Sequence, residues 1–91
     1  MATVRLRIRG KVQGVGYRLW ATRTATGLGL RGWVRNRADG SVEVLATGTC
    51  GQVAAMAEAC REGPIGARVT EVIVTPDEAD GSLGFVALPT E

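Results

Sequence analysis

The residues of this chain whose types and spacing are best suited to chemistry are two glycines and an arginine, namely Gly14, Gly16 and Arg18. Glycines allow a backbone to curl so that several N–H groups point at one spot. A helix that starts there adds partial positive charge, and an arginine offers a planar fork of donors that matches phosphate oxygens. The run therefore predicts an anion site, although a tight turn with a surface arginine fits these few residues equally well.

Several other chemistries lack the residues that they need. The chain has no histidine, and its two cysteines, Cys50 and Cys60, lie ten positions apart in a segment with a helical pattern. A helix would separate them by about 15 Å, which is too far for a disulfide. Zinc and haem sites and the histidine-dependent nucleophile arrangements are therefore excluded. We expect chemistry that uses no metal and no cofactor.

Charge is distributed unevenly along the chain. The net charge is +2, but residues 1–40 carry +8 and residues 41–91 carry −6. An anionic ligand is therefore expected to bind through the N-terminal half. Most of the arginines in that half are expected to be solvated surface residues.

The elements that must position these residues follow from periodicity. Alternating apolar and basic residues predict a strand over residues 3–9, and apolar residues at helical spacing predict a helix over residues 17–28. Asp39-Gly40 is a hairpin signal between two runs, and Thr49 with Gln52 matches a capping box at the start of a second helix. Strands are predicted over residues 32–37, 41–47, 68–75 and 85–88, and the second helix ends at Gly63-Pro64.

This order of elements predicts a fold. It indicates an α+β, ferredoxin-like βαββαβ sandwich, with one antiparallel sheet covered on one face by two helices and a short extra strand at the end. Residues 1–91 are expected to form a single domain. With no signal peptide and no long apolar run, we expect a cytoplasmic monomer that does not bind membranes. The fold itself specifies no activity.

Two nucleotide motifs can be rejected by their context. Residues 27–32 match G-x-G-x-x-G, but this segment follows a predicted helix and leads into a strand, the reverse of a dinucleotide-binding turn. Lys11 is followed by Val12 rather than by Ser or Thr, so it does not complete a Walker A loop. ATP or GTP hydrolysis by that route is not expected.

Asn36 is a second candidate for chemistry. Asparagine is disfavoured in strands, and such a residue most often faces solvent or approaches a turn. In a ferredoxin-like fold, however, the end of the second strand can lie close to the loop after the first strand. Asn36 could then face Arg18 across a shallow pocket.

Three stretches together resemble the acylphosphatases, namely KVQGVGYR at residues 11–18, LGLRGWVRN at 28–36 and DGSVE at 39–43. The similarity is specific from about residue 4 to residue 48, whereas the second half matches in length and element order. The chain departs from many members in lacking a terminal tyrosine.

The resemblance implies hydrolysis of acyl phosphates to a carboxylate and inorganic phosphate, without a metal. By position, Arg18 matches the family's catalytic arginine, and Asn36 matches the asparagine that positions water. The implied phosphate-binding residues are Gln13, Gly14, Val15, Gly16, Tyr17 and Arg18.

Two other functions fit the same fold. One is an RNA-binding module, but such modules stack bases on exposed strand aromatics, and the first strand here carries arginines instead. We therefore expect no nucleic-acid partner. The other is a phosphate- or carbamoyl-phosphate-binding domain without turnover, related to the first domain of larger hydrogenase-maturation proteins. Release of phosphate from an acyl phosphate separates the enzyme from such a binder.

Overall fold

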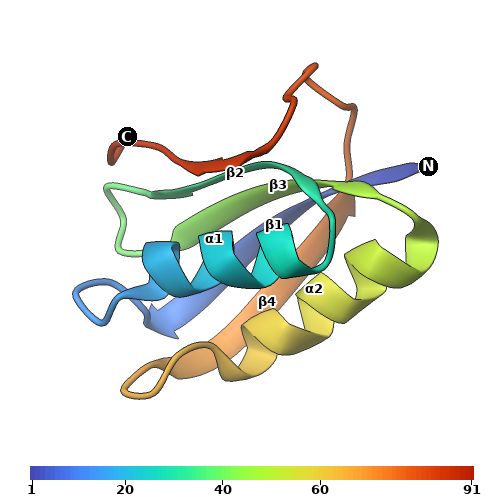
Figure 1. The fold of residues 1–91 in the computed structure, drawn as a ribbon. Coiled ribbons are helices and arrows are strands. Elements are labelled where there is room, and N and C mark those ends of the chain that lie inside the picture. Colours follow the sequence, from blue (N-terminus) through green and yellow to red (C-terminus); the bar gives the residue numbers. More distant parts are fainter.

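The computed structural model of the protein describes residues 1–91. Two helices lie against one face of a five-stranded sheet (Figure 1). Neither helix is long and apolar enough to cross a membrane. The elements are β1 (Ala2–Lys11), α1 (Tyr17–Gly27), β2 (Arg31–Asn36), β3 (Val42–Gly48), α2 (Cys50–Glu62), β4 (Arg68–Pro76) and β5 (Phe85–Ala87).

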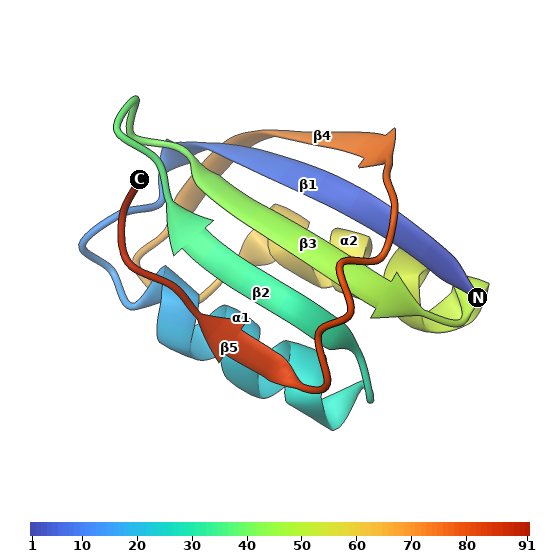
Figure 2. The ribbon, with the colours of Figure 1, turned by 90° about the horizontal axis from the view of Figure 1, so that it is seen from above.

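The sheet confirms the predicted ferredoxin-like fold and corrects one part of it. The strand order is β4-β1-β3-β2-β5, and all pairs are antiparallel except β2 with β5, which is parallel (Figure 2). The sheet is therefore mixed rather than wholly antiparallel. β4 ends beside the start of β1, where Asp77 N–H donates to the Thr3 carbonyl, and β2 starts at this same end of the sheet. The chain after β4 crosses that end, so β5 begins beside the beginning of β2 and runs with it.

The core lies between the sheet and the helices. In β1, Leu6 and Ile8 face the helices and are fully buried, which is what the period-2 pattern predicts. α1 packs beneath β2 and β5, whereas α2 packs mainly beneath β4 and β1. The predicted capping box is present, because Thr49 and Gln52 each accept a hydrogen bond from the other's backbone N–H. The largest buried core side chains are Tyr17, Leu6, Ile8, Met56, Val12, Val34, Val42 and Val44.

The open face of the sheet is more polar and less solvated than expected. Glu43 of β3 is only 2% exposed there, and it accepts hydrogen bonds from Arg5 and Arg35. Burial by itself would raise the pKa of Glu43, but these guanidinium groups outweigh it and hold the pKa below its ordinary value. The arginines around Glu43 are Arg5, Arg7, Arg35 and Arg37. They are half-buried and ion-paired, rather than simply solvated.

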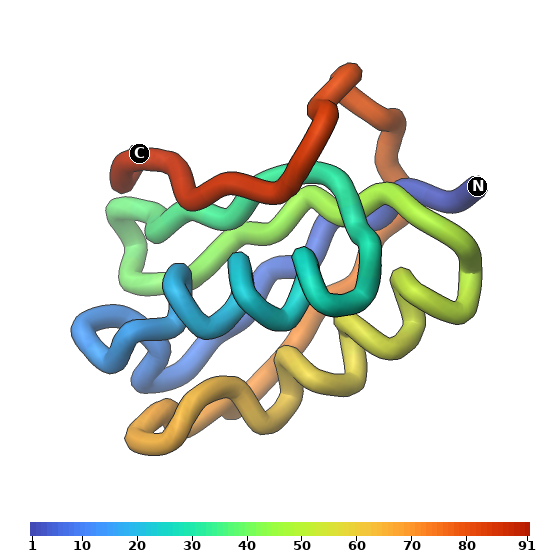
Figure 3. Tube along the Cα trace, in the orientation of Figure 1, coloured from blue at the N-terminus to red at the C-terminus, as the bar shows by residue number.

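Three segments that are distant in sequence meet at one end of the sheet. The loop after β1, the β2–β3 hairpin and the C-terminal residues lie together there (Figure 3). The Ala38 N–H donates to the Glu91 carbonyl, and the Gln13 side chain donates to the Arg37 carbonyl. This end of the sheet holds the candidate site.

Candidate active site

The loop between β1 and α1 presents free backbone N–H groups. Gly14 and Gly16 have φ values of 76° and 80°, a left-handed conformation that residues with a Cβ rarely adopt. Gly16 is the N-cap of α1, and no side chain caps this end of the helix. None of the backbone N–H groups of residues 13–19 donates to an acceptor within the protein. The loop and the helix N-terminus therefore form a cradle suited to an anion.

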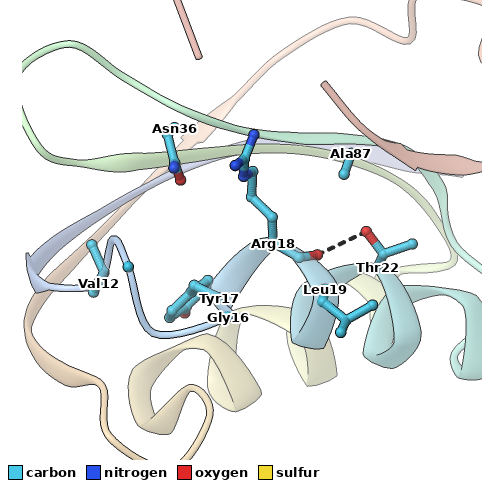
Figure 4. A pocket seen from close by; sticks show the side chains of 9 residues that line it. Val12, Gly16, Tyr17, Arg18, Leu19, Thr22, Asn36 and Ala87 are labelled. Carbon is cyan, nitrogen blue, oxygen red and sulfur yellow. Dashed lines mark hydrogen bonds between the residues drawn. The ribbon is translucent and has the colours of Figure 1, made fainter. Parts of the chain in front are cut away.

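The cradle opens into a pocket of about 430 Å³. Its walls come from the loop, the first turns of α1, the end of β2 and β5 (Figure 4). Arg18 is the only charged residue among those walls. The lining residues are Val12, Gly14, Gly16, Tyr17, Arg18, Leu19, Thr22, Asn36 and Ala87.

Arg18 lies in the first turn of α1, and the C-terminal segment holds its side chain. One guanidinium nitrogen, Nη1, donates to the Leu88 carbonyl at 3.1 Å. Figure 4 shows the guanidinium group between Asn36 and Ala87. A guanidinium has five N–H donors, so this single bond fixes its position and leaves others free for phosphate oxygens.

Asn36 is the last residue of β2, and its side chain lines the same pocket (Figure 4). The amide oxygen Oδ1 is buried and accepts no hydrogen bond from another residue. Burying an unsatisfied acceptor costs about 1–3 kcal/mol, so this oxygen adds nothing to the stability of the fold. The structure thus brings Arg18 and Asn36 to one pocket, as the sequence predicted.

Two of the predicted loop residues lie outside the pocket walls. The Gln13 amide donates to the carbonyls of Arg37 and Ser41 at 2.8 and 2.9 Å. Val15 packs against the edge of the core. Their side chains therefore do not face the pocket, and they can serve a phosphate only through their backbone N–H groups. Gln13 instead fastens the loop to the hairpin that follows Asn36.

Tyr17 anchors the start of α1 and is not a proton donor in the pocket. Its ring is 2% exposed and meets Trp20 edge-on at 5.2 Å, and its hydroxyl donates to the Cys60 carbonyl at 2.7 Å. Burial, with a smaller effect from Cys60, raises the pKa of Tyr17 far above its ordinary value. Burial also raises the pKa of the Cys60 thiol to about 11, so this cysteine stays neutral at pH 7.

Four pocket residues were not anticipated from the sequence. Val12, Leu19, Thr22 and Ala87 line the walls, and the Leu88 carbonyl holds Arg18 from just outside them. The i, i+4 spacing of Arg18 and Thr22 is the one signal that could have placed a further residue on this side of α1. Leu88 acts through its main chain, so its side chain carries no signal.

A ferredoxin-like sandwich with an open amide cradle, a tethered arginine and an unpartnered asparagine amide defines a class of small phosphate-handling domains. Comparison with known proteins narrows this class. The acylphosphatase family profile matches residues 4–86. The acylphosphatase of Rhodospirillum rubrum is 56% identical over 90 residues, which cover 99% of each chain. The chain belongs to the acylphosphatase family.

Solved structures agree with this assignment. The acylphosphatase of Bacillus subtilis superposes with a TM-score of 0.93 at 36% identity, covering 97% of this chain and 99% of its own. HypF from T. kodakarensis contains a similar domain, with a TM-score of 0.87 at 26% identity, which covers 100% of this chain but only 12% of HypF. The protein is an enzyme that hydrolyses acyl phosphates, as its family and its relatives indicate.

Proposed function

We propose that hydrolysis proceeds by direct, in-line attack of water on phosphorus, with the phosphoryl group held by residues 13–18 and Arg18. The observation that carries this mechanism is that Asn36, whose amide oxygen has no hydrogen-bond partner in the protein, lines the same pocket as Arg18 and the glycine loop with its free amides. Arg18 and the amides stabilise the charge on the phosphoryl oxygens, and Asn36 orients the attacking water. Gln13 and Val15 contribute through their backbones.

The bond that breaks needs no general acid. A carboxylic acid has a pKa of roughly 4, so the carboxylate leaves readily at pH 7. The water oxygen bonds to phosphorus while the bond from phosphorus to the acyl oxygen breaks, and its electron pair leaves with the carboxylate. An amide is too weak a base to take a proton from water, so the protons of the water pass to the phosphate product. The missing histidine is therefore no obstacle.

The donor set of the pocket fits a reaction without a metal. Its walls contain no carboxylate, thiolate or imidazole, the groups that bind catalytic metal ions most strongly. The positive charge that a metal would supply comes instead from Arg18 and the end of α1. We accordingly propose catalysis without metal or cofactor.

The proposal also covers the cellular location, oligomeric state and partners of the protein. We propose a cytoplasmic monomer that binds no nucleic acid. Both cysteines are free thiols, which suits a reducing compartment. On the open face, the guanidinium groups of Arg5 and Arg35 lie 5.8 and 4.6 Å from the Trp33 ring, so this aromatic residue is not free to stack on a base.

One assay tests the mechanism and its main alternative together. Phosphate release from benzoyl phosphate is measured with excess EDTA, for the wild type, Arg18→Lys and the control Arg23→Lys. Arg23 is exposed on the same helix and outside the pocket. We expect full activity in EDTA, a loss of at least about 10² for Arg18→Lys because lysine lacks the planar fork, and no loss for the control. Loss of activity in EDTA contradicts catalysis without a metal, and phosphate binding without turnover favours a non-catalytic binder.

A further inference from the structure

The pocket continues past Arg18, on the side away from Asn36. Figure 4 shows Arg18 between Asn36 and Ala87, with Leu19 and Thr22 farther along α1 from the glycine loop. The side chains of Leu19, Thr22 and Ala87 are not part of the amide cradle, which consists of main-chain N–H groups. The volume of about 430 Å³ lies in the lower part of the range for small-ligand pockets, about 300–1,000 Å³, and leaves room for more than a phosphate.

This part of the wall is apolar and carries no charge. Leu19 is 57% exposed although it is a large hydrophobic residue, and the core-facing residues of α1 are instead Tyr17, Ala21 and Ala25. Its exposure therefore does not follow from core packing. Scattered exposed leucines are ordinary on flat surfaces, but this one lines a concavity.

The other two wall residues add no charge and no free proton donor. The Thr22 hydroxyl donates to the Arg18 carbonyl at 2.8 Å, so its proton is already used within the helix. Ala87 pairs with Val34 across the β2–β5 ladder and lines the pocket with a single methyl group. Arg18 is the sole charged residue of the whole pocket, and its side chain is already bonded to the Leu88 carbonyl.

We infer that Leu19, Thr22 and Ala87 form a subsite for the acyl group, which selects uncharged, apolar acyl groups. The inference rests on the proposed in-line mechanism. In-line attack places the incoming water and the leaving oxygen on opposite sides of phosphorus. With water at Asn36, the leaving carboxylate and its substituent point toward Leu19, Thr22 and Ala87. An acyl group with a second carboxylate or phosphate finds no cation there and must lose hydration against apolar walls.

The substrate series that tests this subsite keeps the chemistry constant. Acetyl, butyryl and hexanoyl phosphate release carboxylates of similar acidity, so differences in kcat/KM report contacts with the alkyl chain. Burying one methylene group fully is worth about fourfold, and a half-open wall should give about twofold per methylene. We expect kcat/KM to rise along the series in the wild type. 4-Carboxybenzoyl phosphate should be hydrolysed at least about tenfold less efficiently than benzoyl phosphate.

Variants of Leu19 test whether this residue causes the dependence of kcat/KM on the acyl group. Leu19→Ala should flatten the dependence on chain length, Leu19→Met should restore it, and Leu19→Lys should reverse the preference between 4-carboxybenzoyl and benzoyl phosphate. Leu83→Ala is the matched control, since Leu83 is 94% exposed and lies outside this pocket. Each variant is compared by its own ratio between substrates, so a general loss of activity or of folded protein cancels.

The outcomes separate the subsite from the mechanism. If the wild type hydrolyses acetyl phosphate but kcat/KM does not depend on chain length or charge, the acyl subsite is wrong and the mechanism stands. The same holds if Leu19→Ala and Leu19→Lys keep the wild-type ratios. If the wild type hydrolyses none of these substrates, the proposed function fails together with the subsite.

Discussion

Replacement of Asn36 by alanine should change activity and stability in opposite directions. The amide side chain makes no hydrogen bond within the protein, and its Oδ1 is a buried acceptor without a partner. Asn36→Ala therefore breaks no native bond and removes a group whose burial costs about 1–3 kcal/mol. Part of that gain is offset by the small volume lost. We expect the free energy of unfolding to stay level or to rise by about 1 kcal/mol, which raises Tm by about 4–8 °C.

The same substitution should cost most of the activity. Loss of one preorganised group that acts on the transition state typically lowers kcat by about 10²–10³, or about 2.7–4 kcal/mol. Hydrolysis of benzoyl phosphate measures the rate, and urea unfolding measures the stability. Wild-type activity in Asn36→Ala refutes the water-positioning role. A loss of activity that is matched by a comparable loss of stability points instead to a structural role.

A control variant should show the reverse pattern. Gln52 completes the capping box of α2 and lies outside the pocket. Gln52→Ala removes the bond that its Oε1 accepts from the Thr49 N–H at 2.9 Å, so stability should fall by about 1 kcal/mol while kcat/KM is retained. The contrast separates an amide that stabilises the fold from one that serves the reaction.

Two further predictions concern the loop and the open face. Gly16→Ala and Gly81→Ala place a Cβ at φ values of 80° and 83° with no atom within 4 Å, so each should lose about 1–2 kcal/mol of stability. Only Gly16→Ala should also lose activity, by about 10², because the loop amides shift; equal kcat/KM in the two variants contradicts the amide cradle. Glu43→Gln removes the charge shared by partly exposed arginines, of which Arg5 and Arg35 keep Asp77 and Glu91 as partners, and should cost about 1.5–3 kcal/mol in urea unfolding. Because the folded-state pKa of Glu43 is lowered, its contribution is present above pH about 4.5 and is lost as the pH falls through the folded pKa; an acid limb unchanged in Glu43→Gln contradicts this assignment.

The sequence predicts the helix-facing half of the molecule well. Leu6, Ile8 and the Thr49–Gln52 box carry local, periodic signals, and each element falls within about two residues of its predicted bounds. The parallel pairing of β5 is not predicted, because three residues with no turn signal specify no partner. The direction of β5 depends on where β4 ends, because β4 ends at the same end of the sheet where β2 starts.

The residue types in the sequence predict the candidate site, but the sequence does not predict the hydrogen bonds that hold its side chains in place. Each of the main candidates has a signal of its own in the sequence. Gly16 has unusual conformational freedom, Arg18 has charge, and Asn36 has poor strand propensity. The Gln13 amide, by contrast, is bonded to two hairpin carbonyls, and Arg18 to the Leu88 carbonyl. Main-chain acceptors are the same in every residue, so such contacts leave no trace in the sequence. The burial of Glu43 among arginines likewise depends on strand register, which brings Arg5, Arg7 and Arg35 beside it.

The central claim is that water attacks phosphorus directly in the pocket between Arg18 and Asn36. The most direct measurement is hydrolysis of benzoyl phosphate in water enriched in ¹⁸O, with excess EDTA, followed by mass analysis of both products. We expect one labelled oxygen in the inorganic phosphate and none in the benzoate, at a rate that falls by at least about 10² in Asn36→Ala. Label in the benzoate, which indicates attack on the carbonyl carbon, would contradict the mechanism.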